Sequence, residues 1–253
     1  MPKIRGAFHL HSQYSYDGRI PLAEMASFLK SKGYSFGLMS EHNYHRSEKR
    51  YLCREELSNF IRECQSLSSP EFLLIPGLEY SCCDNKVHIV VTPLADNSAL
   101  EGIETPEQVI EKTRREKSLA FLVHPFFGEA YRRVSPEVFG KFDGFEVWNY
   151  NYQSRRGPSL SECGQLKQWF KRPGVLAVAG LDLHRREKFG DVWIEMEVSS
   201  LNQEAVFGNL RQGKYTLSAC GRHFDSAGNL SGLWSHLTKR LAARVLNLLR
   251  IGK

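Results

Sequence analysis

The chain has 253 residues, of which 42% are hydrophobic and 25% charged, and this composition excludes an intrinsically disordered protein. The net charge is +6, but residues 226–253 supply five basic residues and no acidic one. Only +1 therefore remains on residues 1–225, which argues against the uniformly basic surface of a non-specific nucleic-acid binder. No apolar run reaches the roughly 18 residues of a membrane-spanning helix and no secretory signal opens the chain, so we expect a soluble, cytoplasmic protein.

Apolar, strand-like runs alternate with helical stretches along the chain, a pattern that predicts a parallel α/β architecture. Strands are predicted at 4–9, 36–41, 72–76, 87–92, 120–124, 144–148 and 175–180, and helices at 21–32, 54–67, 106–116, 136–139 and 160–170. A strand at 193–199, a helix at 202–213 and a strand at 215–219 follow. The main series amounts to about seven strand and helix units.

Metal-ligating residue types fall at or just beyond the ends of these predicted strands. Neutral imidazole is the commonest protein ligand for borderline metals, and carboxylates also bind them. Parallel barrels gather the carboxyl ends of their strands at one face, whereas an open doubly wound sheet would spread these side chains too widely. We therefore expect a closed or distorted barrel with one pocket that holds His9, His11, Asp17, His42, Glu79, His88, His124, Asp182 and His184.

His9 and His11 stand two residues apart on a predicted strand, so their side chains leave the same face and can bind one ion. Glu79 has two carboxylate oxygens that could bridge two ions, at the separation of about 3.5–4 Å used in two-metal hydrolysis. A hydroxide held between those ions would be the nucleophile. Nine ligands exceed what one ion can use, so we expect more than one metal.

Several short stretches carry a resemblance to a known family. They are Phe8-His-Leu-His-Ser12 with Tyr16-Asp-Gly18, Ser40-Glu-His-Asn43, Pro76-Gly-Leu-Glu79, Val87-His88, Val123-His-Pro125 and Gly180-Leu-Asp-Leu-His184. From about residue 4 to 221, the chain resembles the polymerase and histidinol phosphatase (PHP) family of metal-dependent phosphoesterases. Within this family, residues 204–218 resemble the closing helix and strand of the proteins in one branch, which includes the carbaryl-hydrolase-type metallohydrolases. Glu41 stands where the family usually has Asp.

The resemblance implies a distorted (β/α)7 TIM-like barrel of the PHP type and three divalent ions, which would be Zn, Mn or Fe. It implies that the first ion is held by His9, His11, Glu79 and Asp182 and the second by Glu79, His88 and His124. Asp17, His42 and His184 would hold the third. We expect Glu79, Asp182 and His184 to take part in catalysis.

A phosphorylated substrate needs cations beside the metals, and Arg binds phosphate through paired hydrogen bonds. The candidates for substrate binding are Arg132, Arg155, Arg185, Arg222 and Asn149. The aromatic run at 147–152 could stack on a base or ring, or it could pack in the core. Glu41 could orient a ligand histidine, or it could be a plain surface carboxylate.

The chain is predicted to divide into a metallohydrolase barrel at 1–225 and a linker with a basic amphipathic C-terminal helix at 226–253. Apolar residues in this tail recur at spacings of three or four, as on one stripe of a helix. The stripe could dock on the barrel. Alternatively, the basic residues could bring the helix to an anionic membrane surface.

The sequence therefore predicts a metal-dependent phosphoesterase that hydrolyses a small phosphomonoester or a nucleotide-like phosphate. A carboxyl or carbamate ester hydrolase would use the same metals. A nuclease is less favoured because the barrel carries little net positive charge, and no stable nucleic-acid partner is expected. A catalytically silent scaffold would lack metal altogether.

Overall fold

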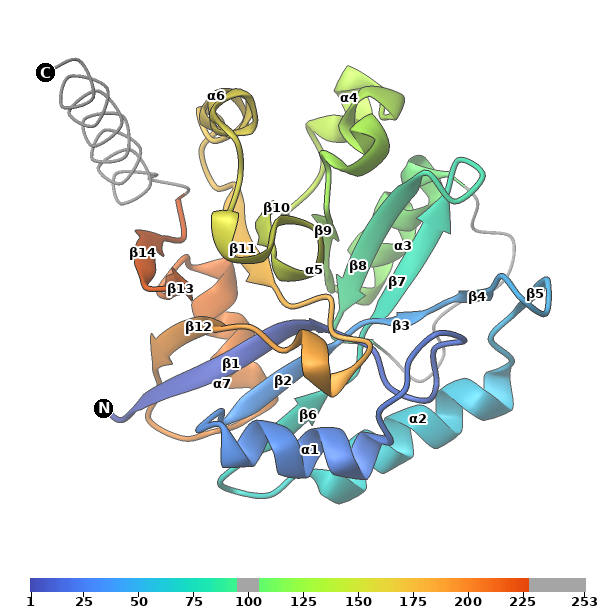
Figure 1. The fold of residues 1–253 in the computed structure, drawn as a ribbon, viewed down its shortest axis with the longest axis vertical. Helices are drawn as coiled ribbons and strands as arrows, with labels where there is room; N and C mark the ends of the chain where they lie inside the picture. Colours follow the sequence, from blue (N-terminus) through green and yellow to red (C-terminus); the bar gives the residue numbers. More distant parts are fainter. Residues whose placement is uncertain (95–104, 228–253) are drawn as a thin grey trace, which may run out of the picture.

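The computed structural model describes residues 1–94 and 105–227, which form a mixed α/β fold (Figure 1). One six-stranded sheet has the order β14-β13-β12-β1-β2-β6. Its strands are β1 (Lys3–Leu10), β2 (Phe36–Met39), β6 (Leu73–Ile75), β12 (Val192–Glu197), β13 (Thr216–Ala219) and β14 (Arg222–Asp225).

A second six-stranded sheet has the order β11-β10-β9-β8-β7-β3. Its strands are β3 (Glu41–His42), β7 (Leu78–Cys82), β8 (Val87–Thr92), β9 (Leu119–Leu122), β10 (Gly144–Asn149) and β11 (Leu176–Gly180). A short ribbon pairs β4 (Tyr44–His45) with β5 (Arg50–Tyr51).

Helices cover the outer faces of both sheets, and α1 and α2 lie side by side beneath β2 and β6 (Figure 1). The α-helices are α1 (Leu22–Ser31), α2 (Arg54–Leu67), α3 (Pro106–Glu116), α4 (Pro136–Phe139), α5 (Tyr150–Gln153), α6 (Leu160–Trp169) and α7 (Gln203–Arg211). The 3-10 segments are η1 (Phe127–Arg133), η2 (Ser154–Arg156) and η3 (Arg186–Lys188). Capping boxes at Cys53, Thr105 and Ser159 fix the starts of α2, α3 and α6.

The two sheets adjoin along both sides of a shared interior. On one side a single residue separates β2 from β3, and Gly77, between β6 and β7, lies so close to Met39 that a Cβ would meet the Met39 carbonyl oxygen at 2.2 Å. On the other side the Leu181 amide donates to the Phe8 carbonyl at 2.9 Å. Inside, the Phe8 and Phe121 rings pack edge to face with centroids 5.5 Å apart.

Every predicted strand and helix at residues 4–219 has an observed counterpart whose ends agree within two residues. The hydrogen-bonded strands of the described residues form two six-stranded sheets and the short β4–β5 ribbon rather than one closed ring. The observed class is therefore mixed α/β. The predicted C-terminal linker and helix at 226–253 lie outside the described residues from residue 228 onward. Within the described part, no helix is long and apolar enough to cross a membrane.

The expectation of a uniformly parallel sheet was wrong around β8. Glu79 lies in β7, a strand that the sequence analysis did not predict, and β8 runs antiparallel to both β7 and β9. The turn at 83–86 is too short for the crossover that parallel strands require. His88 therefore lies near the start of its strand, and the reversed direction of β8 brings it to the edge where the other strands end.

Candidate metal centre

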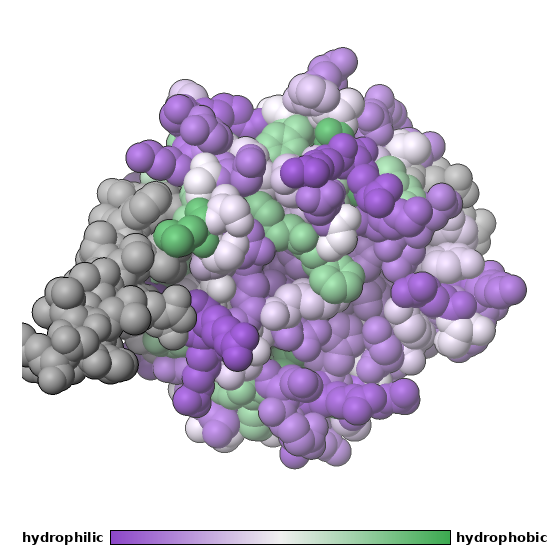
Figure 2. All heavy atoms as spheres, turned by 45° about the horizontal axis from the view of Figure 1, so that its top comes forward, coloured by the Kyte–Doolittle hydropathy of each residue, from purple (hydrophilic) through white to green (hydrophobic). Residues whose placement is uncertain are grey.

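The nine predicted ligands converge at one edge of the two sheets. Seven of them line a cavity of about 680 Å³, namely Asp17, His42, Glu79, His88, His124, Asp182 and His184. His9 and His11 lie beneath them and are fully buried. On the face shown in Figure 2, hydrophobic residues stand beside a hollow lined mainly by hydrophilic ones.

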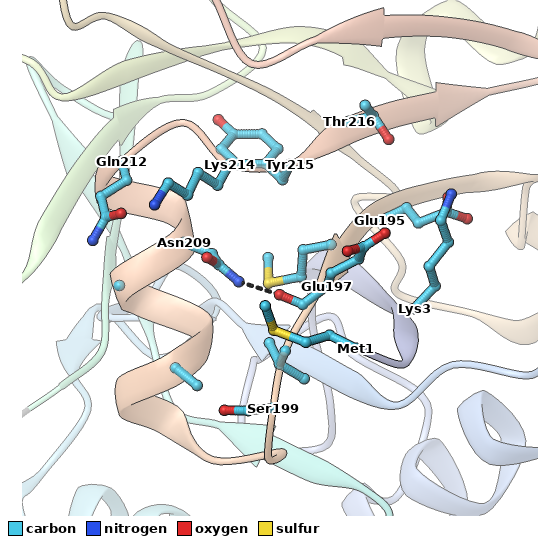
Figure 3. A pocket seen from close by; sticks show the side chains of 14 residues that line it. Met1, Lys3, Glu195, Glu197, Ser199, Asn209, Gln212, Lys214, Tyr215 and Thr216 are labelled. Carbon is cyan, nitrogen blue, oxygen red and sulfur yellow. Dashed lines mark hydrogen bonds and ion pairs between the residues drawn. The ribbon is translucent and has the colours of Figure 1, made fainter.

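A second cavity, of about 590 Å³, lies between α7 and the strands β12 and β13 (Figure 3). Its lining includes Glu195, Glu197 and Tyr215, and the Asn209 side chain donates to the Glu197 carbonyl at 2.8 Å. The lining contains no histidine, cysteine or aspartate. This cavity therefore lacks the ligand set of a transition-metal site.

One oxygen of Glu79 faces the histidines of β1. Glu79 Oε2 lies 3.5 Å from His9 Nε2 and 3.3 Å from His11 Nε2. Asp182 Oδ1 lies 3.6 Å from each of the same two nitrogens. These four side chains come from β1, β7 and the segment after β11, and together they surround one point.

The other oxygen of Glu79 faces a different pair of imidazoles. Glu79 Oε1 lies 2.8 Å from His88 Nδ1 and 3.0 Å from His124 Nε2. The carboxylate thus divides its two oxygens between two groups of histidines, which is the arrangement that a bridging ligand requires.

A third group lies toward solvent. Asp17 Oδ1 is 3.4 Å from His42 Nε2 and 3.4 Å from His184 Nε2. The group is not isolated, because His42 Nδ1 lies 3.2 Å from Glu79 Oε2 and the ligand atoms of His11, His42 and His184 lie within 4.8 Å of one another. The three groups form one continuous cluster.

The cluster fits divalent cations. Five of its atoms are buried without a hydrogen-bond partner among the described residues: His9 Nε2, His11 Nε2, His42 Nδ1, His88 Nε2 and Asp17 Oδ1. A buried polar atom left unpaired costs roughly 1–3 kcal/mol. Coordination to a metal would satisfy those of these atoms that face other predicted ligands, among them His9 Nε2, His11 Nε2 and Asp17 Oδ1.

The charges of the cluster also favour cations. Burial alone would raise the pKa of Glu79, but the surrounding imidazoles hold it well below its usual value. Burial and the neighbouring imidazoles of His184 and His42 lower the pKa of His11 well below its usual value. Ionised carboxylates and neutral imidazoles are the forms that bind metals.

His9 behaves differently from His11. Burial would lower the pKa of His9, but the carboxylates of Glu146, Asp182 and Glu79 raise it well above its usual value. An incoming cation would therefore displace a proton from this ring, so that metal binding at His9 is coupled to proton release.

Three ligand residues have left-handed backbone conformations, which are uncommon for residues other than glycine. The φ angle is 66° at His9, 29° at His124 and 48° at Asp182. At His9 the pairing register between β1 and β2 shifts, as in a β-bulge. Such strain persists where the surrounding structure enforces it, and it commonly marks functional sites.

The fold was compared with known proteins. No family model matches the chain, and no curated protein matches it in sequence. Among solved structures, a two-domain protein from Bacteroides vulgatus that contains a predicted PHP-like metal-dependent phosphoesterase superposes with a TM-score of 0.65 at 15% identity. The match covers 86% of this chain and 65% of that protein, slightly less than two thirds of its length. The chain has the PHP-like fold.

Two further structures share this fold. The lesion-specific endonuclease EndoQ from Pyrococcus furiosus matches with a TM-score of 0.60 at 17% identity, over 85% of this chain and 58% of EndoQ. PsfC from Pseudomonas syringae matches with a TM-score of 0.59 at 14% identity, over 96% of this chain and all of PsfC. The PHP resemblance of the motifs is thus confirmed at the level of the fold, and the carbaryl-hydrolase branch stays a prediction.

Within the PHP-like fold, Glu146 was missed by the sequence analysis. It lies on β10 with 1% of its surface exposed. Its Oε1 accepts from His9 Nδ1 at 2.9 Å, and its Oε2 accepts from the His124 amide at 2.7 Å and from Asn149 Nδ2 at 2.9 Å. A carboxylate that binds Nδ1 leaves Nε2 free for a metal. The sequence does contain one indication of this role, because Glu146 is a charged residue inside the otherwise uncharged strand Gly144–Asn149.

Glu41 supports His11 through a serine. Ser15 Oγ donates to Glu41 Oε2, and it lies 3.1 Å from His11 Nδ1 and 3.0 Å from the His42 amide. Because the hydroxyl proton goes to Glu41, the serine oxygen accepts from both His11 and His42. His11 Nε2 is then the nitrogen that faces the metal.

We expect Ser15→Ala to lower the affinity for metal by about 10- to 100-fold, as the loss of an outer hydrogen-bond partner does in other metal sites. The substitution leaves the His11 ring free to take its other tautomer. Titration of the metal-free protein with Zn²⁺, followed by calorimetry, measures the affinity. Ser27→Ala on the exposed face of α1 is the matched control. Equal affinities in the two variants would contradict the role of Ser15.

The predicted substrate-binding residues are distributed unevenly. Arg185 lines the cavity, whereas Arg132, Arg155 and Arg222 do not. Arg132 is exposed and pairs with Glu129, and Arg222 lies over the Trp148 ring. Asn149 is buried, with its amide donating to Glu146 and Asp182. Its position suits it to hold the metal ligands in place.

Four other cations line the cavity beside Arg185: Arg46, Lys86, Arg133 and Lys188. Lys86 comes from the β7–β8 turn, Arg133 ends η1 and Lys188 ends η3. Arg133 is adjacent to the predicted candidate Arg132, and nothing in the sequence marks Arg46, Lys86 or Lys188. Five basic residues thus surround the metal cluster.

Proposed function

We propose that the protein is a metal-dependent phosphoesterase that hydrolyses a small phosphomonoester or nucleotide-like phosphate at a trinuclear site. The observation that carries the proposal is the division of Glu79 between two groups of histidines, in a cavity lined by five basic residues. Carboxylates and imidazoles would hold the cations, and the arginines and lysines would bind an anionic substrate. Zn, Mn and Fe all suit this mixed ligand set.

In this proposal Glu79 joins the two buried ligand groups, with Asp182 closing the first and Asp17, His42 and His184 forming the third. When bound, the divalent ions would neutralise phosphate charge and activate water for attack on phosphorus. His184 is partly exposed at the cavity, and its pKa is raised to about 9 because the carboxylates of Asp17 and Asp182 outweigh the effect of burial. Glu79, Asp182 and His184 are the proposed catalytic residues.

The proposed architecture is a distorted (β/α)7 barrel. The two sheets adjoin on both sides of one interior, as strands of a distorted (β/α)7 barrel would. Residues 1–225 would form this hydrolase unit, and the predicted linker and basic amphipathic helix at 226–253 lie outside the described residues from residue 228 onward.

The basic lining favours phosphate esters over carboxyl or carbamate esters, because the latter place no comparable negative charge at the reacting group. A nuclease is the second candidate, since the endonuclease EndoQ shares the fold. Incubation with single- and double-stranded oligonucleotides separates these two phosphoesterase activities.

The test is to load the protein with Mn²⁺ or Zn²⁺ and to compare hydrolysis of p-nitrophenyl phosphate and p-nitrophenyl acetate. We expect turnover of the phosphate ester and a KM for it that rises about 10- to 100-fold in Arg133→Ala, the effect of losing a charged hydrogen bond. Arg132→Ala is the adjacent control outside the cavity. Faster turnover of the acetate, or equal effects of the two substitutions, would contradict the proposal.

A further inference from the structure

Two exposed aromatic rings stand beside the metal centre. Phe127 is 57% and Tyr152 45% exposed, although large hydrophobic side chains are mostly buried in this protein. Their rings are stacked, with centroids 4.2 Å apart and planes inclined by 26°. The Tyr152 ring lies 5.2 Å from that of His124, and both aromatic residues line the cavity. The pair thus offers uncovered ring surface next to a predicted metal ligand.

The rings are fixed relative to the metal ligands. The Phe127 amide donates to the His124 carbonyl at 2.9 Å. The Tyr152 amide donates to Asn149 Oδ1 at 3.2 Å, and Asn149 Nδ2 in turn donates to Glu146 and Asp182. Both aromatic residues are therefore held by hydrogen bonds of their backbone amides to residues in or beside the ligand cluster. A binding surface benefits from such support by neighbouring residues.

The pair also lines two pockets of different polarity. The first is the metal cavity with its five basic residues. The second is a smaller pocket of about 250 Å³. Its lining has no lysine or arginine and includes Pro125, Phe126, Gln153 and Glu162. A ligand that spans the pair would place its anionic end among the basic residues and an uncharged end among the aromatic ones.

We propose that Phe127 and Tyr152 form a stacking platform for a planar ring carried by the alcohol portion of the phosphate ester. The inference rests on the proposed phosphoesterase function and specifies its substrate class. Aromatic side chains stack on the faces of planar heterocycles. The uncovered face of the pair provides that surface, while the metals and basic residues bind the phosphate.

The probes are adenosine 5′-monophosphate and ribose 5-phosphate, which are both phosphate esters of the primary 5′-hydroxyl of ribose and differ in the presence of the adenine ring. We expect kcat/KM to favour the nucleotide by about tenfold or more, in line with the strength of base stacking on aromatic side chains. In Phe127→Ala and Tyr152→Ala this preference should fall toward one, while kcat/KM for ribose 5-phosphate stays within about threefold. Leu160→Ala, an exposed apolar residue that lines neither pocket, is the matched control.

Binding of adenosine to the metal-free protein, measured by calorimetry, gives a readout that does not depend on catalysis. Binding that is lost in Phe127→Ala and kept in Leu160→Ala supports the platform even if neither ester is hydrolysed, an outcome that would refute the phosphoesterase function alone. Equal kcat/KM for the two esters in the native protein would overturn the platform and leave the phosphoesterase function standing. Absence of adenosine binding would overturn the platform as well. Thermal melting of each variant checks that it is folded.

Discussion

Glu79→Gln is expected to remove two of the three proposed metal ions. Phosphoester hydrolysis should fall by more than about 100-fold, the upper end of the loss caused by removing a residue that only hydrogen-bonds to a metal ligand. The amide keeps the size of the carboxylate but has one oxygen and no charge, so it cannot bridge two cations. Each carboxylate oxygen of Glu79 lies within 3.5 Å of imidazole nitrogens. In the variant, one of the two groups of imidazoles would therefore face an NH₂ group in place of an oxygen.

Metal content per chain, measured by elemental analysis after dialysis, tests this expectation directly. Glu137→Gln makes the same chemical change on a largely exposed side chain that pairs with Lys141, and it should retain full metal content. If Glu79→Gln kept the metal content and turnover of the native protein, the bridging role of Glu79 would be excluded.

Glu146→Gln should weaken metal binding by about 10- to 100-fold, although Glu146 is not a predicted ligand. The single amide oxygen can accept from the His124 amide and from Asn149 Nδ2, as Oε2 does in the native protein. The NH₂ group then faces His9 Nδ1 and donates to it. This places the ring proton of His9 on Nε2, the nitrogen that should bind the metal.

The outcome differs from that of Glu79→Gln. The group with His9 should bind its ion more weakly, whereas the group of His88 and His124 should keep its native affinity, because Glu79 Oε1 is unaffected. Titration with Zn²⁺ followed by calorimetry distinguishes the weakening of one site from the loss of two. If Glu146→Gln bound Zn²⁺ at every site with the affinity of the native protein, the tautomer of His9 would not depend on Glu146.

The sequence was sufficient to predict most of the longer elements and the ligand types, although it did not predict β7. Strand and helix boundaries follow from local hydrophobic runs, prolines and capping residues, so they are encoded within a few residues of each element. The placement of histidines and carboxylates near strand ends predicted one shared pocket, and the resemblance to the PHP family implied that His9, His11, Glu79 and Asp182 hold one ion. The structure brings these four side chains together.

The roles of other residues depend on contacts between distant parts of the chain. Glu146 and His9 are 137 residues apart, and only the pairing of the two sheets makes them hydrogen-bond partners. The direction of β8 was mistaken because β7, the strand joined to β8 by a short turn, was not predicted. Lys86 and Lys188 reach the cavity through the conformations of their turns, for which hydrophobic periodicity carries no information.

The sequence by itself therefore determined the order of the strands and helices along the chain and the set of residues able to bind metal, because both depend on local chemistry. Only the tertiary structure decided how Glu79 divides its oxygens, which nitrogen of His9 and of His11 is free, and which basic residues line the cavity. Those features depend on distances of about 3 Å between side chains that are far apart in the chain, and such distances are set by packing.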